Sequence, residues 1–147
     1  MAKENIMAKD DCLFCGIIAG ELPSEKIYED DDVVAILDLY PVRPGHALVI
    51  PREHTKDFIS TSPELLSRVI TKVHKVAGLV ADAMNADGFN LAAFNGRASG
   101  QEVFHLHFHI IPRKAGDGVR VGWPKMEYRE GEMAEVARRI RAAGNQT

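Results

Sequence analysis

Seven residues in the last third of the chain, His105 to Ile111, alternate histidine with apolar side chains. Successive side chains of a β-strand point to opposite faces of a sheet, so the alternation predicts a strand with three imidazoles on one face. Its other face carries Leu106, Phe108 and Ile110, which we expect in the core. Solvated strand faces are usually built from Thr, Lys, Glu and Ser. Because imidazole can be a neutral nucleophile, a proton carrier or a metal ligand near neutral pH, we interpret the histidine face as a chemical site.

Length and composition limit the class of protein. The chain has 147 residues, of which 46% are hydrophobic, and this fits one globular domain with a real core. No apolar stretch approaches the roughly 20 residues that a membrane span needs, so a soluble protein is expected. Residues 1–11 lack the apolar stretch of a signal peptide, which predicts a cytoplasmic location. A net charge of -3 without a basic block argues against a nucleic-acid partner but is compatible with a small phosphorylated ligand.

The remaining pattern predicts an α+β domain. Five segments bounded by Gly, Pro, Asn and Asp are predicted strands: 27–29, 33–38, 47–51, 89–95 and 105–111. Apolar residues recur at helical spacing from Leu65 to Met84, after a capping box of Thr61 and Glu64. A C-terminal helix is expected at 130–143 and a short helix at 15–19. Strands paired as hairpins with helices on one side give a five-stranded antiparallel sheet.

The domain organisation follows from these elements. We expect one domain over residues 1–147, with its core at about 12–114. Residues 1–11 are predicted to be flexible, and residues 115–147 are predicted to form a C-terminal extension that carries the second helix.

A polar loop precedes the histidine run. Gly100 can let backbone N–H groups approach an anion, while Asn95 and Gln101 offer neutral hydrogen bonds to phosphate oxygens. Alone this loop is better explained as an ordinary connection, but its position beside three histidines favours a phosphate cradle. His46, which follows the glycine turn at Gly45, is equally compatible with a hydrogen-bonded core residue and with a catalytic one.

Cys12 and Cys15 are the two cysteines of the chain, and they form a C-x-x-C pair. Such spacing occurs in metal knuckles, in redox pairs and by coincidence. The strand context of a thioredoxin-like pair is missing here, which favours a metal site or plain structural cysteines. A closed structural zinc site needs four ligands, and His54 and His105 could complete a Cys2His2 set.

Taken together, these residues resemble the histidine triad (HIT) superfamily. The run from His105 to Ile111 matches the family signature, in which three histidines are separated by single apolar residues and followed by two further apolar residues. Further matches are Gly45 and His46 before a Leu-Val-Ile-Pro strand, Asp38 after the second strand, and the Asn95, Gly100 and Gln101 loop. The resemblance covers about Cys12 to Lys114.

The resemblance implies a dimer whose two five-stranded sheets join, and hydrolysis at the α-phosphorus of a purine nucleoside phosphate. His107 is then the nucleophile that forms a covalent nucleotidyl-histidine, a sensible role for a neutral imidazole. His109 and His46 would bind phosphate oxygens, with Asn95 and Gln101 as neutral partners. Asp38 would hold the ribose hydroxyls. The apolar base pocket would be lined by Phe14, Ile17, Ile36 and Leu39.

The resemblance also bears on the metal. Some bacterial members, and the related galactose-1-phosphate uridylyltransferases, pair a C-x-x-C with two histidines on zinc, in positions that match Cys12, Cys15, His54 and His105. A structural zinc and no organic cofactor are therefore expected, with His105 assigned to the metal rather than to phosphate.

Departures from the family patterns leave the substrate open. Glu102 stands where the phosphoramidase branch has a serine hydroxyl, and an ionised carboxylate accepts hydrogen bonds but does not donate them. His109, in place of the glutamine of the transferase branch, favours hydrolysis over transfer. The stretch after Pro112 resembles dinucleoside-polyphosphate hydrolases, whereas Trp123-Pro124 resembles phosphoramidases. The alternatives are therefore a phosphoramidase, a dinucleoside polyphosphate hydrolase, and a nucleotide- or zinc-binding adaptor without turnover.

Overall fold

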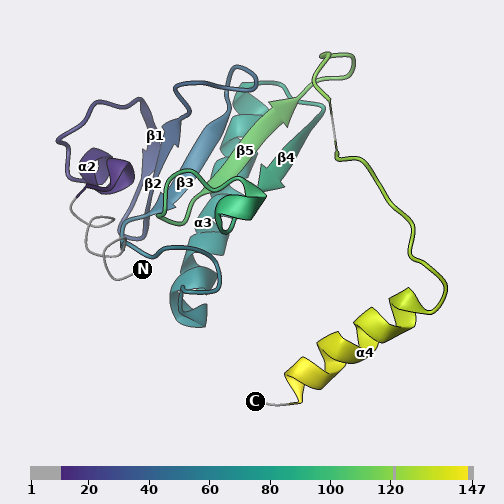
Figure 1. Ribbon diagram of the computed structural model, residues 1–147. Coiled ribbons are helices and arrows are strands. Elements are labelled where there is room, and N and C mark those ends of the chain that lie inside the picture. The colour runs from purple at the N-terminus through teal and green to yellow at the C-terminus, as the bar shows by residue number, and fades with distance from the viewer. Residues whose placement is uncertain (1–10, 121, 146–147) are drawn as a thin grey trace. The chain divides into compact units, whose positions relative to one another are not determined.

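A computed structural model describes residues 11–120 and 122–145 of the chain. These residues fall into two compact units, one ending at Asp117 and the other beginning at Gly118 (Figure 1). The prediction for residues 1–11 lies outside the described residues except at Asp11. No helix among the described residues has the length and apolar character needed to cross a membrane.

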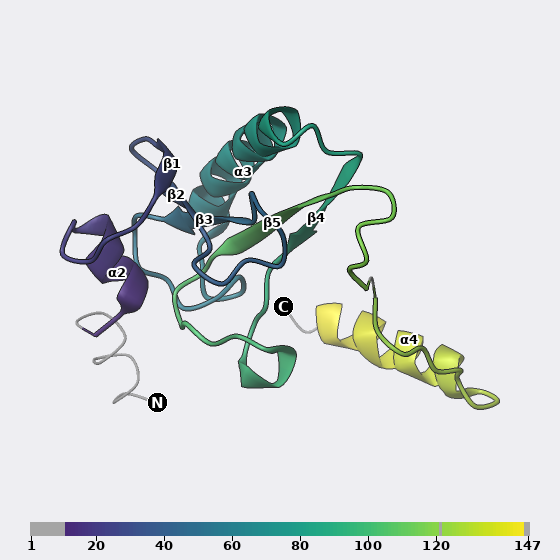
Figure 2. The same cartoon turned by 90° about the horizontal axis from the view of Figure 1, so that it is seen from above.

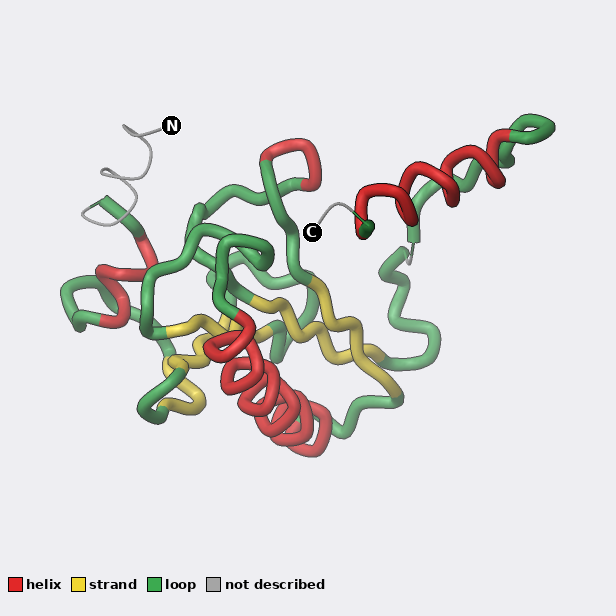
Figure 3. Tube along the Cα trace, turned by 90° about the horizontal axis from the view of Figure 1, so that it is seen from below, coloured by secondary structure: helices red, strands yellow, loops and turns green. Residues whose placement is uncertain are grey.

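The first unit is built on one antiparallel sheet of five strands, which confirms the predicted fold class. The strands are β1 (Lys26–Glu29), β2 (Val33–Leu37), β3 (Ala47–Pro51), β4 (Gly88–Ala92) and β5 (Phe108–Arg113). Their order in the sheet is β1-β2-β3-β5-β4, so β2, β3 and β5 lie inside the sheet, and β1 and β4 form its edges (Figure 1). Figure 3 shows the strands in yellow and the helices in red.

Both faces of the central strands are buried. Val33 and Ala35 of β2 pack with the long helix α3 (Pro63–Ala83), while Val34 and Ile36 pack with the short helix α2 (Leu13–Ile18) on the opposite face. Figure 2 shows α3 lying along one face of the sheet. The expectation that the helices share one side is therefore wrong. Continuous apolar runs such as Val33–Leu37 have side chains on both faces, and each face needs its own cover.

The N-cap of helix α3 lies one residue later in the chain than predicted. Ser62 is the N-cap, and its hydroxyl accepts a hydrogen bond from Leu65 N at 3.2 Å. Thr61 is buried instead, with its Oγ1 2.6 Å from the carbonyl oxygen of Asp57. Two adjacent hydroxyl residues compete for one cap, and the fold of the preceding loop decides between them.

The histidine run is only partly a strand. β5 begins at Phe108, so His105 and His107 precede it in irregular chain that bends at residues 103–105. Leu106 N donates to the carbonyl oxygen of Thr55 at 2.7 Å rather than joining a strand ladder. The predicted facing still holds, because Leu106, Phe108 and Ile110 are all buried in the core beneath α3. β5 also continues through Pro112, which is tolerated because the pairing with β3 ends at Ile110.

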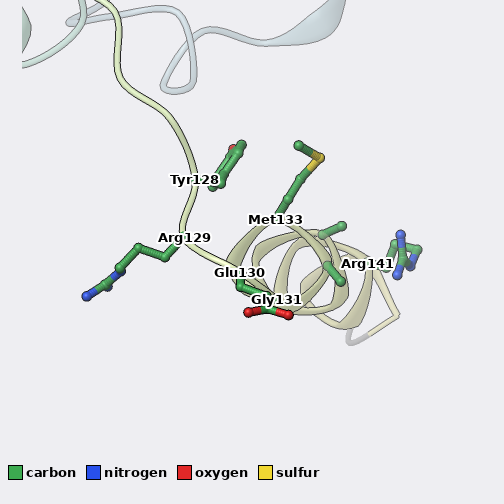
Figure 4. Close-up of a pocket in the computed structure, with 8 residues that line it drawn as sticks. Tyr128, Arg129, Glu130, Gly131, Met133 and Arg141 are labelled. Carbon is green, nitrogen blue, oxygen red and sulfur yellow. The ribbon is translucent and has the colours of Figure 1, made fainter.

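The second unit carries helix α4 (Glu132–Gly144), close to the predicted span of 130–143. Its first turn has Glu132 and Glu135, and its last turn has Arg141, which suits the helix dipole. A shallow hollow on this unit is lined by Tyr128, Met133 and Arg141 among others (Figure 4). None of the predicted site residues lies in that hollow.

Candidate active site and metal centre

The predicted metal ligands meet at one point. Cys12 is the N-cap of α2, Cys15 lies in the first turn of that helix, His54 follows β3 and His105 precedes β5. The His105 Nδ1 atom lies 3.5 Å from Cys12 Sγ, 3.6 Å from Cys15 Sγ and 3.1 Å from His54 Nδ1. Cys15 Sγ lies 3.3 Å from His54 Nδ1.

These spacings fit a tetrahedral zinc ion. Usual Zn–S and Zn–N bond lengths give tetrahedral edges of about 3.3 to 3.8 Å, which the four measured separations approach. The orientation of His105 also fits, because its Nε2 atom lies 2.8 Å from the carbonyl oxygen of Pro51. A carbonyl only accepts, so Nε2 carries the ring proton and the Nδ1 lone pair points to the cluster.

A second group, Asp38, His46 and His109, also brings its ligand atoms close together. Here the hydrogen bonds favour fixed ring protons over metal binding. Val42 N donates to His46 Nδ1 at 3.0 Å, so the ring proton of neutral His46 is on Nε2. That Nε2 lies 2.9 Å from His109 Nδ1, which must accept, and this places the proton of His109 on its Nε2. A metal ion on His46 Nε2 would have to displace that proton.

His107 has the opposite tautomer. Its Nδ1 lies 2.7 Å from the carbonyl oxygen of His105, so Nδ1 carries the proton and Nε2 keeps a lone pair. The backbone carbonyl is the kind of fixed acceptor that a nucleophilic imidazole requires. The ring of His109 is 5.0 Å away between centroids. A neutral ring with a free lone pair on Nε2, His107, therefore lies beside a neutral ring with an N–H at Nε2, His109.

Burial keeps these imidazoles uncharged. It lowers the pKa of His46 and of His107, and it lowers the pKa of His109 to about 4, with the neighbouring His107 and His46 adding to the effect. The contact of His46 Nε2 with Asp38 Oδ2 at 3.5 Å is therefore one between a carboxylate and a neutral ring. At neutral pH the three rings are therefore uncharged, and the Nε2 lone pair of His107 is available without loss of a proton.

Acid sensitivity of the fold follows from the same burial. The folded pKa of His109 is about 4 against an ordinary value of 6.5, so between these values the unfolded chain binds a proton that the folded chain does not. We expect the Tm to fall as the pH drops from about 6.5 towards 4, and His109→Gln to flatten this slope. Melting curves across this range measure it, with His74→Gln on the exposed face of α3 as control. An equal slope in both variants would contradict the assignment.

The loop that carries Asn95 and Gln101 uses several of its polar groups in hydrogen bonds to its own backbone and to residues 56–58. Asn95 Oδ1 accepts from Phe58 N at 2.8 Å. Gln101 is buried: its Oε1 accepts from Gly96 N, and its Nε2 donates to the carbonyl oxygens of Lys56 and Val103. The Gln101 amide thus donates to the backbone of two chain segments, at Lys56 and at Val103. Gln101 shapes the connection instead of presenting a donor to solvent.

Both glycines of the loop adopt a backbone that other residues rarely reach, with φ of 85° at Gly96 and 104° at Gly100. The N–H groups at Gly100 and Gln101 are used within the loop. The Gly100 N–H donates to the carbonyl oxygen of Arg97, and Gln101 N donates to that of Gly96. These two N–H groups are therefore not aimed at an anion here. Glu102 is exposed beside them.

The residues predicted to line a base pocket separate into two sets. Phe14, Ile17 and Ile36 are buried together on the α2 face of the sheet, the face that also carries the imidazoles. Leu48 of this cluster pairs with His109 across the sheet. Leu39 differs, since 81% of it is exposed in the loop after β2. Asp38 is partly buried near the same loop, and its Oδ1 accepts from Tyr40 N.

Comparison with known proteins identifies the family. The HIT domain model matches residues 19–116, about two thirds of the chain. The chain belongs to the HIT domain family. This HIT protein is 43% identical over 114 residues to adenylylsulfatase HINT3 of Arabidopsis thaliana, an alignment covering 78% of the chain and 58% of that relative. The chain thus spans less than two thirds of that relative's length.

Two solved structures of the family resemble the fold. A histidine triad nucleotide-binding protein from Candida albicans superposes with a TM-score of 0.80 at 31% identity, covering 92% of this chain and 98% of that one. A zinc-bound histidine triad family protein from Mycobacterium smegmatis has a TM-score of 0.72 at 35% identity, covering 91% and 99%. That neighbour contains zinc, and this HIT protein has a four-residue group that could hold a metal.

Several contacts of the site leave no trace in the sequence. The Pro51 carbonyl and the Val42 N–H orient His105 and His46, but every residue has a carbonyl and nearly every residue an N–H. The aromatic neighbours are likewise unforeseen: Phe94 packs edge-on against His109 at 5.2 Å between centroids. From the sequence, the alternation around His109 predicted the face of the strand on which this residue lies, but not the residues that contact it.

Proposed function

We propose that this HIT protein is a nucleotide hydrolase that cleaves at the α-phosphorus of purine nucleoside phosphoramidates or related conjugates. The observation that carries the proposal is the pair of short ring contacts, His107 Nδ1 to the His105 carbonyl oxygen and His109 Nδ1 to His46 Nε2, which together imply a lone pair on His107 Nε2 and a proton on His109 Nε2. A nucleophile and an oxyanion donor are the two groups that such a displacement needs.

The reaction takes two displacements. His107 Nε2 attacks the α-phosphorus, the bond to the leaving group breaks, and the leaving group departs with the electron pair. The ring becomes positively charged, and its Nδ1–H bond to the His105 carbonyl stabilises that charge. Water then attacks the phosphorus of the nucleotidyl-histidine and releases one proton to solvent, the P–N bond breaks with its electron pair returning to Nε2, and the nucleoside monophosphate leaves. An amine leaving group takes up one proton from solvent as it departs in the first step. His109 Nε2–H donates to a phosphate oxygen in both steps.

Other residues would hold the nucleotide. Asp38 is proposed to accept the ribose hydroxyls, and His46 to fix the proton of His109. Gln101 and Gly100 would act by shaping the phosphate loop, while Asn95 keeps its amide N–H groups for a phosphate oxygen. Phe14, Ile17 and Ile36 would border the base from the buried cluster.

The leaving group is the open part of the proposal. An amine leaving group must gain a proton, whereas sulfate or a nucleotide leaves as a stable anion. Purified protein should be given an adenosine phosphoramidate, a diadenosine polyphosphate and adenylyl sulfate in separate and competing assays. The name of the Arabidopsis relative motivates the third substrate. Fastest release of AMP from the phosphoramidate supports the proposal, and nucleotide-induced stabilisation without any product would support the adaptor alternative instead.

We further propose that Cys12, Cys15, His54 and His105 hold a structural zinc ion. With four protein ligands the site is closed, so the metal supplies cross-linking and no open coordination position for substrate. The His105 ring would then be a zinc ligand, while its backbone carbonyl oxygen accepts a hydrogen bond from Nδ1 of His107.

A homodimer is proposed through the β4 edge of the sheet. β4 exposes Phe89 and Leu91, with 44% and 50% of each accessible, whereas the other edge strand β1 begins and ends with the charged Lys26 and Glu29. An exposed apolar edge strand is a ready template for pairing with another chain. Light scattering should find a dimer that Leu91→Lys converts to monomer, while Ile27→Lys on β1 leaves it intact. A wild-type monomer at micromolar concentration would overturn the proposal.

A further inference from the structure

One aromatic residue joins the metal cluster to the nucleophile. Phe14 lies on α2 between Cys12 and Cys15, and 4% of it is exposed. Its ring meets His107 edge-on, with centroids 4.9 Å apart and planes at 73°. It also meets His105 at 5.9 Å and 83°. A residue predicted to line the base pocket therefore contacts the reacting imidazole itself.

Helix α2 depends on its neighbours for its position. It has six residues, too few for a helix that is stable in isolation. Two kinds of contact hold it on the sheet. One is apolar, through Phe14 and Ile17 in the buried cluster. The other is the pair of sulfur atoms beside the His54 and His105 rings.

The His107 ring makes two contacts with residues that belong to the metal cluster or lie next to it in the sequence. Its Nδ1 proton is fixed by the carbonyl of His105, whose own ring belongs to the cluster. The ring is packed from the side by Phe14, which the two cysteines flank in sequence. Loss of the cluster would loosen the hydrogen bond and the packing together.

We propose that α2 is a metal-anchored clamp on the nucleophile, in which the four-ligand cluster fixes the helix and Phe14 holds the His107 ring in its reactive orientation. This rests on the proposed hydrolase function of His107. Phe14 is then a positioning residue: it touches the nucleophile, but it takes no part in bond making.

Steady-state kinetics on the zinc-loaded protein test the clamp. Phe14→Leu keeps an apolar side chain but removes the aromatic edge, and we expect kcat to fall about 10- to 100-fold with KM changed less than about twofold. Ile18→Val, on the same helix and packed against the same apolar cluster, is the matched control and should keep kcat within about twofold. Equal kcat values in the two variants would overturn the clamp.

Combining variants tests whether cluster and ring act as one unit. His54→Ala removes a ligand that does not touch His107, and should lower kcat to a similar extent. Added to Phe14→Leu it should cost less than about twofold more, because coupled groups are not additive. His54→Cys keeps a metal donor and should restore kcat. Effects that multiply would show that cluster and ring act separately, and so would refute the clamp.

Nitrogen NMR of the His107 ring gives a readout that needs no turnover. The zinc-loaded wild type should show one tautomer, with the proton on Nδ1, whereas Phe14→Leu and the chelator-treated wild type should show both tautomers. One tautomer in all samples would overturn the clamp. If no nucleotide is hydrolysed, the proposed function fails, and the ring spectra alone decide whether Phe14 orients the His107 ring. If loss of zinc unfolds the chain, the spectrum of Phe14→Leu decides the same question, because this variant keeps all four ligands.

Discussion

Replacing His107 by alanine is expected to lower kcat/KM for a nucleoside phosphoramidate by at least about 10⁴-fold, the scale seen when a covalent nucleophile is removed. The reason lies in the ring tautomers of His46, His107 and His109. Among His46, His107 and His109, only His107 presents a ring lone pair whose opposite N–H is held by a carbonyl acceptor, whereas His109 presents a proton. Neither His109 nor His46 can replace it without breaking its own hydrogen bond.

The assay needs a control for general damage and a direct view of the intermediate. His74→Ala changes an exposed histidine on α3 and should keep full activity. Rapid quenching of the wild type should trap a nucleotide adduct on the peptide that contains His107, and the variant should lack it. Binding of AMP, followed by thermal shift, should persist in the variant. Turnover equal to that of the wild type would remove His107 from the mechanism.

Zinc is expected to have the largest effect on stability. Freshly purified protein should contain about one zinc ion per chain, and removing it should lower the free energy of unfolding by about 4 kcal/mol when free zinc had been about 1000-fold above its Kd. The physical reason is that the unfolded chain does not bring Cys12 and Cys15 near His54 and His105, so metal binding favours the folded state.

Variants separate the metal from general effects of mutation. His54→Ala should abolish zinc binding and lower the Tm even with zinc present, while His54→Cys should retain the metal. Glu53→Ala, at the exposed neighbouring position, should leave both unchanged. Elemental analysis and denaturant curves measure these outcomes. Full stability without zinc would mean that the four residues form an ordinary buried cluster.

The class of fold and the main facing of the site are local properties, and the sequence predicts them. Alternation around Phe108 correctly assigned Leu106 and Ile110 to the core beneath α3. Helical spacing predicted α3, but the choice between Thr61 and Ser62 as its cap depended on the loop before it. Likewise, burial of both faces of β2 required a second cover, and the pattern alone did not say that α2 would provide it.

By itself, then, the sequence determined which chemical groups the protein has and the periods at which they recur: three histidines, a C-x-x-C pair and a glycine-containing loop. Only the tertiary structure decided what each group does. Tautomers are set by backbone atoms distant in sequence, such as the Pro51 carbonyl behind His105 and the Val42 N–H behind His46. Because backbone groups are nearly the same in every residue, their pairing leaves no pattern in the sequence and exists only once the chain has folded.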